Sequence, residues 1–275
     1  MNFKEESEAT ITKIRMKLQF GSNNDSDKDH ADFKRGNAIR AAVPIAALLN
    51  ALCGNNPTFH VFAKLNALGI EKYGYGQCGE QSQAAFIDLI EKGVYPIDFC
   101  VTTLGGHNLL VVGRDLNSDP KDISTWGKNA FICDPWANKV YPVSEFNKMQ
   151  EEDFINGNYN KEIYKKGTMP PHYLSGRMSI VQSVKNEEEL NEFRQNIKLD
   201  EDIFKMFSLK ITSDEELNAD LETMKSYLAG LSNSHLGSNP GALPALLQAS
   251  NCLMALEKNL DKKAMPACTP SMFKK

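Results

Sequence analysis

One cysteine of this chain stands where a loop gives way to a helix, in the sequence Gly-Gln-Cys-Gly-Glu-Gln at residues 76–81. From residue 84 to residue 90, apolar residues recur at i,i+4, which predicts an amphipathic helix that begins near Cys78 and ends at Gly93. A thiol in the first turn of a helix lies at the positive end of the helix dipole, which favours the thiolate. Cys78 is therefore a candidate nucleophile, and its backbone amide is placed to help bind an oxyanion.

Two later residues complete a candidate catalytic set. Residues 97–102 and 107–113 flank a Gly-Gly turn, which predicts a β-hairpin with His107 at the start of its second strand. A further strand is predicted to end at Asp134, and pairing of these strands would bring the imidazole close to the carboxylate. An imidazole generates and holds a thiolate, and a carboxylate orients the imidazole. We therefore predict a triad of Cys78, His107 and Asp134.

Each of these residues also has a structural interpretation. Cysteines are often small buried apolar residues, and a lone histidine is more often a satisfied residue at a strand end. Asp134 precedes Pro135, as turn residues commonly do. Trp136 is either a core aromatic residue or a wall of the substrate cleft.

The composition limits the classes of function. With 275 residues and a net charge of -4, from 31 basic and 35 acidic residues, the chain gives no electrostatic case for nucleic acid or an anionic membrane as its main partner. The six cysteines contain no Cys-x-x-Cys pair, which favours reduced thiols. A metal site built from Cys78, Cys100, His107 and Cys133 matches no zinc spacing. We therefore expect neither a metal nor a cofactor.

Two segments bear on the membrane and on export. The most apolar run, residues 38–53, is too short for a membrane span, carries Arg40 and is interrupted by Pro44, so that a buried helix is expected. The first residues have neither the basic start nor the apolar region of a Sec-type signal peptide, and none is expected.

The remaining pattern predicts an α+β fold in two parts. An alternation of apolar and polar residues over 14–20 predicts an early strand, and residues 150–174 are expected to be mostly loop. The chain beyond residue 186 is predicted to be helical and to form a small bundle. We therefore predict a catalytic domain at 1–185, with its core at about 36–185, and a helical C-terminal domain at 186–275. The other expected helices are 37–52, 58–68, 187–197, 213–232 and 242–263, and the other expected strands are 140–141 and 179–184.

The motifs resemble a known grouping. A Gly-x-Cys-Gly-Glu helix start, a histidine before an apolar strand and an Asp-Pro-Trp strand end resemble the papain-like and transglutaminase-like cysteine enzymes, especially bacterial effectors with a Cys-His-Asp triad. The resemblance covers about residues 73–142. It implies a cysteine-bearing helix packed on an antiparallel sheet that carries the histidine and the aspartate. Papain places an oxyanion glutamine six residues before its cysteine, where this chain has Lys72, so Gln77 or another donor must take that role.

We expect a cysteine hydrolase or acyltransferase that acts on protein amide bonds. The sequence does not choose between a thiol protease and a glutamine deamidase or transglutaminase. The alternative is a non-catalytic binding or adaptor effector that uses its C-terminal helices. Those helices either select a protein substrate or bury one face of the catalytic sheet. The resemblance further implies an effector that is made in a bacterial cytoplasm and delivered into the cytosol of a host cell, where its substrate would be a host protein.

Overall fold

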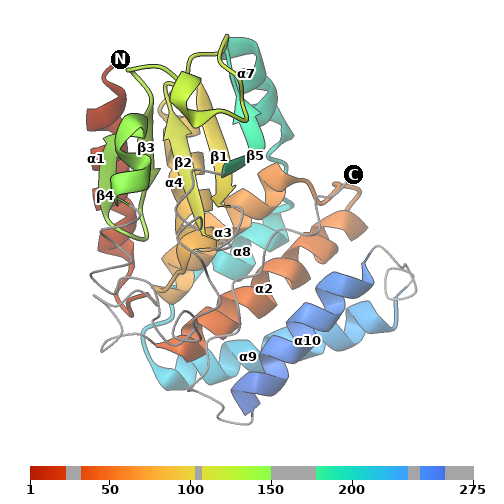
Figure 1. Cartoon of the computed structure of the whole chain (residues 1–275). Helices are drawn as coiled ribbons and strands as arrows, with labels where there is room; N and C mark the ends of the chain where they lie inside the picture. Colours follow the sequence, from red (N-terminus) through yellow and green to blue (C-terminus); the bar gives the residue numbers. More distant parts are fainter. Residues whose placement is uncertain (23–31, 103–106, 150–177, 235–241, 258–275) are drawn as a thin grey trace, which may run out of the picture.

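The computed structural model describes residues 1–22, 32–102, 107–149, 178–234 and 242–257, and these residues form an α+β fold around an antiparallel sheet (Figure 1). The sheet has five strands in the order β4-β3-β2-β1-β5. The predicted hairpin is confirmed, because β1 and β2 pair in antiparallel register with Phe99 opposite Leu110. The strands are β1 (Ile97–Thr102), β2 (Asn108–Val112), β3 (Phe131–Asp134), β4 (Lys139–Pro142) and β5 (Met178–Val184).

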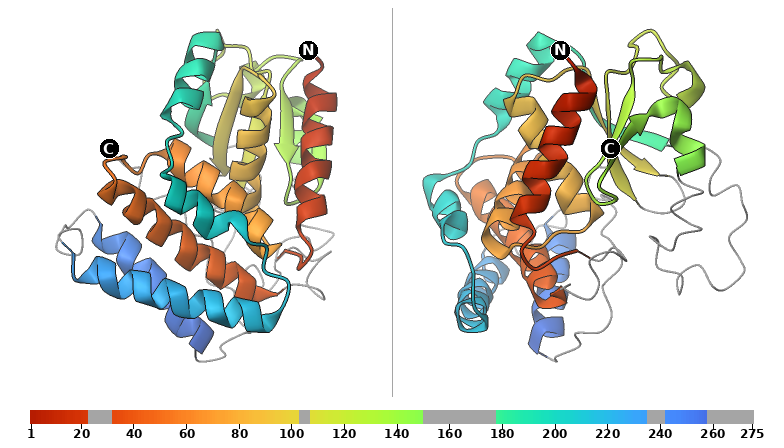
Figure 2. Two further views of the ribbon diagram at one scale, coloured as in Figure 1. Left: turned by 180° about the vertical axis from the view of Figure 1, so that it is seen from behind. Right: turned by 90° about the vertical axis from the view of Figure 1, so that its left-hand side faces the viewer.

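Helices cover one face of the sheet (Figure 2). They are α1 (Phe3–Lys17), α3 (Phe59–Tyr73), α4 (Cys78–Glu91) and α7 (Glu187–Asn196). The apolar stripe of α4 is fully buried at Phe86 and Leu89. Phe59 of α3 packs edge-on against Phe86 and Phe99, with ring centroids 5.6 Å and 5.1 Å apart. This aromatic cluster fixes α4 on the sheet, and therefore fixes the position of Cys78 relative to the strands.

The predicted N-terminal strand is wrong, because the first residues form helix α1. The alternation over residues 14–20 fits a strand, but Ser7, Thr10, Ile11 and Ile14 recur at three and four and are the buried face of the helix. Thr10 Oγ1 donates a hydrogen bond to Asp88 Oδ2 of α4 at 2.6 Å. Packing of this face against α4 therefore outweighed the local alternation.

The opposite face of the sheet is covered by the chain between β2 and β3 and by the residues that follow β4. These two segments contain short 3-10 turns, η1 (Ile123–Thr125) and η2 (Val143–Glu145). Trp126 is buried among side chains of the sheet and donates its indole N–H to the Asp119 carbonyl at 2.9 Å. Both faces of the central strands are thus buried, which agrees with the near-continuous apolar sequence of β2.

Unlike α7, the three later helices pack along α2 (Phe33–Leu52), on the side of the molecule away from the sheet (Figure 1). They are α8 (Glu201–Ser208), α9 (Asp214–Ser232) and α10 (Leu243–Glu257). The predicted start of α9 is confirmed, because Ser213 caps it and exchanges hydrogen bonds with Glu216. Helix α8 was not predicted from the sequence. Apolar residues of α2, α3, α8, α9 and α10 share one hydrophobic cluster, while the domain boundary at residue 185 stays a prediction.

Two predictions concern residues that the structure does not describe. The glycines of the Gly105-Gly106 turn and the expected loop at 150–174 lie outside the described residues.

The expected buried helix is α2, which contains Pro44 and whose central residues are buried. In the part of the chain that is described, no helix is both long enough and apolar enough to cross a membrane.

Candidate active site

Cys78 is the first residue of α4, and the residues around it fix the start of that helix. Gln77 is the N-cap, and its backbone N–H donates to Glu80 Oε2 at 3.0 Å. The other oxygen of Glu80 pairs with Arg40 Nε at 3.3 Å, and Arg40 Nη2 also donates to Gln77 Oε1. A buried guanidinium on α2 thus holds both the cap and the first turn of the helix that carries the thiol. Glu80 therefore serves to anchor the helix end, as expected for an acidic residue at this position.

His107 directly precedes β2, and Asp134 ends the neighbouring strand. The two strands pair with Leu110 opposite Cys133, and this register brings the two side chains together. His107 Nε2 lies 2.6 Å from Asp134 Oδ2, and the two residues are 5% and 1% exposed. His107 also interacts with the Cys78 thiol and lowers its pKa. Because Nε2 faces Asp134, Nδ1 is the ring nitrogen that remains to interact with the thiol. The structure therefore brings together all three residues of the predicted triad.

The charges of these groups are interdependent. Burial disfavours the imidazolium, but the carboxylate and hydrogen bond of Asp134 outweigh burial and, together with Cys78, raise the pKa of His107 to about 10. Burial also disfavours the thiolate, yet the hydrogen bond and charge of His107 and the backbone N–H of Asn108 lower the pKa of Cys78 below its ordinary value. The arrangement therefore favours a thiolate–imidazolium pair at neutral pH.

Asp134 fits both of the interpretations that its sequence allowed. One carboxylate oxygen faces His107, while Oδ1 accepts the backbone N–H of Ala137 at 3.0 Å and so closes the turn after β3. The turn thus holds the carboxylate in the orientation that the imidazole needs. Trp136, in the same turn, packs its ring 5.1 Å from the His107 ring at an angle of 58°. It is 6% exposed, so it shields the imidazole from water.

Lys72 and Gln77 have structural partners in this chain. Lys72, at the position of the papain glutamine, donates to the Met206 carbonyl at 2.6 Å and pairs with Asp220 of α9, so its ammonium is held against α8 and α9. The Gln77 side chain accepts from Arg40 and donates Nε2 to the Tyr75 hydroxyl at 3.3 Å. The oxyanion role of Gln77 stays a prediction.

Sequence reasoning missed two residues of the site, Asn108 and Arg40. Asn108 follows His107 and places its Nδ2 at 3.8 Å from Cys78 Sγ. A signal existed for each: Asn108 is a polar residue at the start of an otherwise apolar strand, and Arg40 is a charge within an apolar helix. A buried polar group needs a partner, so such residues point to an organised polar site.

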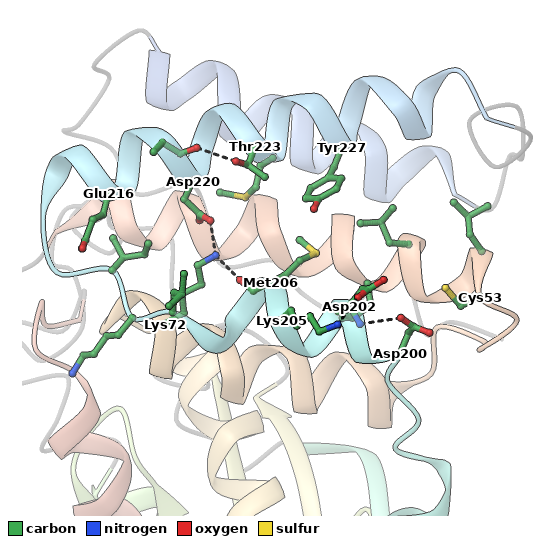
Figure 3. Close-up of a pocket in the computed structure, with 18 residues that line it drawn as sticks. Cys53, Lys72, Asp200, Asp202, Lys205, Met206, Glu216, Asp220, Thr223 and Tyr227 are labelled. Carbon is green, nitrogen blue, oxygen red and sulfur yellow. Dashed lines mark hydrogen bonds and ion pairs between the residues drawn. The ribbon is translucent and has the colours of Figure 1, made fainter.

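Two cavities of the molecule lie away from Cys78, His107 and Asp134. One, of about 890 Å³, lies between α8 and α9, with Lys72 and Asp220 joined in its wall (Figure 3). The other, of about 370 Å³, lies between α1 and the β4 region. None of the predicted triad residues lines either cavity. Within the described ranges, no cluster of three or more His, Cys, Asp or Glu residues is arranged to hold a metal ion. Cys100 and Cys133 belong to hydrophobic clusters on opposite faces of the sheet.

Comparison with known proteins gives no relative for this chain: no family model, no curated protein and no solved structure matches it.

Proposed function

We propose that this protein is a cysteine-dependent acyl-transfer enzyme of the papain-like or transglutaminase-like type, acting on amide bonds of proteins. The observation that carries the proposal is the continuous contact from Asp134 through His107 to Cys78 at the start of α4. A buried carboxylate, an imidazole and a thiol of lowered pKa are the three groups that nucleophilic catalysis by cysteine requires.

The proposed reaction has two steps. The Cys78 thiolate bonds to the amide carbon, and the C=O electron pair moves to the oxygen. When this intermediate collapses, the C–N bond breaks, and His107 gives its Nδ1 proton to the leaving amine or ammonia. Water or an amine then attacks the thioester while His107 takes its proton, and the C–S bond breaks to restore the thiolate. A main-chain amide makes this reaction proteolysis, and a glutamine side chain makes it deamidation or transglutamination.

The test is to capture the acyl-enzyme. p-Nitrophenyl acetate acylates a thiolate and releases p-nitrophenolate without needing a proton. We expect an acetyl thioester on Cys78 by peptide mass spectrometry and rapid p-nitrophenolate release, both lost in Cys78→Ala. Cys53→Ala is the matched control and should behave as the wild type. Acylation of Cys53 at the rate of Cys78, or full activity in Cys78→Ala, would contradict the proposal.

The same variants, tested on a protein substrate, show which kind of amide bond the enzyme attacks. We expect Cys78-dependent release of ammonia or of peptides from a denatured, glutamine-rich protein such as casein. Release of ammonia without cleavage assigns glutamine chemistry, and new peptide ends assign proteolysis. Incorporation of a labelled primary amine separates transglutamination from deamidation.

A binding or adaptor role is the second candidate, and the cavity between α8 and α9 favours it. This cavity is lined by both charged and apolar residues. Its apolar residues include the exposed Leu209 and Tyr227, and Figure 3 shows Tyr227 on the wall that α9 forms. If this role is the main one, the cellular effect of the protein survives Cys78→Ala and is lost when Leu209 and Tyr227 are replaced by Asp and Ser. The opposite pattern supports the enzyme.

Delivery into a host cell is proposed from the resemblance to bacterial effectors. In that setting the substrate would be a host protein. A translocation reporter fused to the chain tests the idea, and a reporter that gives no signal in infected cells would count against it.

A further inference from the structure

Asn108 lies against the sulfur of Cys78 and against the first turn of α4. Its backbone oxygen accepts a hydrogen bond from Ser82 Oγ at 2.8 Å, which ties the start of β2 to the helix. Its side-chain Nδ2 is 3.8 Å from Sγ, and the residue is 2% exposed. A Cβ added at Gly79 would lie 3.5 Å from the same Nδ2, so the amide also borders the helix backbone. Asn108 thus holds an amide donor beside the Cys78 sulfur and the first turn of α4.

The Asn108 amide lies near the place where negative charge would develop when Cys78 attacks a carbonyl. When Sγ bonds to a carbonyl carbon, the oxygen becomes an oxyanion one bond further on, and an effective donor lies about 2.7–3.1 Å from that oxygen. The first backbone N–H groups of a helix, including that of Cys78, have no acceptor within the helix. We infer that the Asn108 side-chain amide and the Cys78 backbone N–H together bind this oxyanion. The inference rests on the proposed acyl-transfer function and names a donor that the sequence did not identify.

A purely structural role for Asn108 has different consequences. If the amide only stabilises the thiolate, its loss slows every reaction of the sulfur. If it binds the oxyanion, its loss slows only attack at a carbonyl. The Asn108 backbone N–H also reaches Cys78, and side-chain substitution leaves that group in place.

Two probes of Cys78 separate these roles. Iodoacetamide alkylates the sulfur by displacing iodide, so no oxyanion forms. p-Nitrophenyl acetate is attacked at its carbonyl carbon, so an oxyanion forms before p-nitrophenolate leaves. For Asn108→Ala we expect unchanged alkylation and an acylation rate about 10²-fold lower, the usual effect of losing one oxyanion donor. Asn108→Leu, which keeps most of the side-chain volume, guards against misfolding and should give the same pattern.

Asn66→Ala is the matched control. Asn66 of α3 donates to Gln83 of α4 at 2.6 Å, so this variant also removes an asparagine bonded to the cysteine-bearing helix. Both rates should stay at the wild-type value. Equal slowing of both reactions by Asn108→Ala and Asn108→Leu, or no slowing of either, would overturn the inference while leaving acyl transfer by Cys78 intact. A wild type that is alkylated but never acylated at Cys78 would overturn the proposed function as well.

Discussion

Cys78 and Cys53 differ in their position in a helix, in the charged groups beside them and in their exposure to solvent. Cys78 begins α4, at the positive end of the helix dipole, whereas Cys53 caps the C-terminal end of α2, at the negative end. Cys78 faces an imidazole. Cys53 is exposed, and its partial desolvation and the nearby Asp200 raise the pKa of its thiol. The less accessible cysteine therefore has the lower pKa, which indicates that electrostatic placement, not exposure, sets the order of the two thiol pKa values.

The largest expected effect comes from removing the base that distinguishes the two sites. In His107→Ala, the thiol of Cys78 loses its partner, and we expect acyl transfer to fall on the order of 10⁴-fold. Alkylation of Cys78 at pH 6 should fall towards the rate of Cys53. The measurement is p-nitrophenolate release together with alkylation of each cysteine.

His60→Ala is the control for this prediction. His60 packs against Phe193 between α3 and α7, with ring centroids 3.9 Å apart and the rings tilted by 44°. Its removal should leave Cys78 reactivity unchanged. An equal loss in both variants would mean that the effect comes from misfolding.

Replacing the Asp134 carboxylate changes the pKa values of His107 and Cys78 but leaves the imidazole in place. In Asp134→Asn, the turn acceptor for Ala137 remains, but the charge that raises the pKa of His107 to about 10 is lost. The imidazolium and thiolate then form less readily at neutral pH. We expect turnover to fall about 10²-fold to 10⁴-fold, with the acidic limb of its pH profile at higher pH and the alkaline limb at lower pH. Unchanged limbs would show that Asp134 does not act on His107.

Turnover and alkylation should differ at high pH in the wild-type protein. Above about pH 10, His107 loses the proton that the leaving amine needs, so hydrolysis of an amide should fall about tenfold per pH unit. The thiolate persists there, so alkylation should stay at its plateau. Parallel decline of both rates would indicate unfolding rather than titration of His107.

Two buried ion pairs allow the surroundings of Cys78 to be compared with the contact between α3 and α9. The side chains of Arg40 and Glu80 are 5% and 14% exposed, and those of Lys72 and Asp220 are 6% and 16% exposed. Arg40→Met and Lys72→Met each leave a carboxylate without its cation. We expect each to lower the free energy of unfolding by about 2 kcal/mol, below the usual value for a fully buried pair, because the carboxylates are partly solvated.

The two variants should nevertheless differ in chemistry. Loss of Arg40 releases the Gln77 cap and leaves Glu80 uncompensated beside Cys78, which raises the pKa of the thiol. Alkylation at pH 6 should therefore slow in Arg40→Met and stay unchanged in Lys72→Met. Denaturant unfolding and alkylation of the same samples measure both effects. Slower alkylation in both would indicate that the two regions are coupled.

The sequence predicted those parts of the fold where local pattern and packing agree. The apolar stripe of α4, the alternation of β1 and the capping residues of α9 were sufficient to predict these elements. The early strand was wrong because the alternation over residues 14–20 ignores the helical signals that precede it. Asn2 caps the helix, and the buried face of the helix packs on α4, where Thr10 bonds to Asp88. α8 was missed because it is short and most of its residues are exposed.

For the candidate site, the sequence predicted the three groups of the proposed triad better than the residues that hold them in place. Cys78, His107 and Asp134 have distinctive chemistry, and each stands at the end of a predictable element. Asn108 and Arg40 belong to the same site because of strand register and helix packing, which the sequence does not specify. The sequence therefore predicted which three groups meet, whereas the contacts that orient them follow from the tertiary structure.

The most direct test of this account is the pH dependence of alkylation at Cys78 and Cys53 in one sample. Iodoacetamide is applied briefly across a range of pH, and each cysteine is quantified by peptide mass spectrometry. We predict that Cys78, although 8% exposed, reaches its plateau well below the ordinary thiol pKa of about 8.5 and reacts faster than Cys53 at pH 6. A Cys78 profile that rises only above that pKa, or that coincides with the profile of Cys53, would contradict the thiolate–imidazolium pair and with it the proposed enzyme.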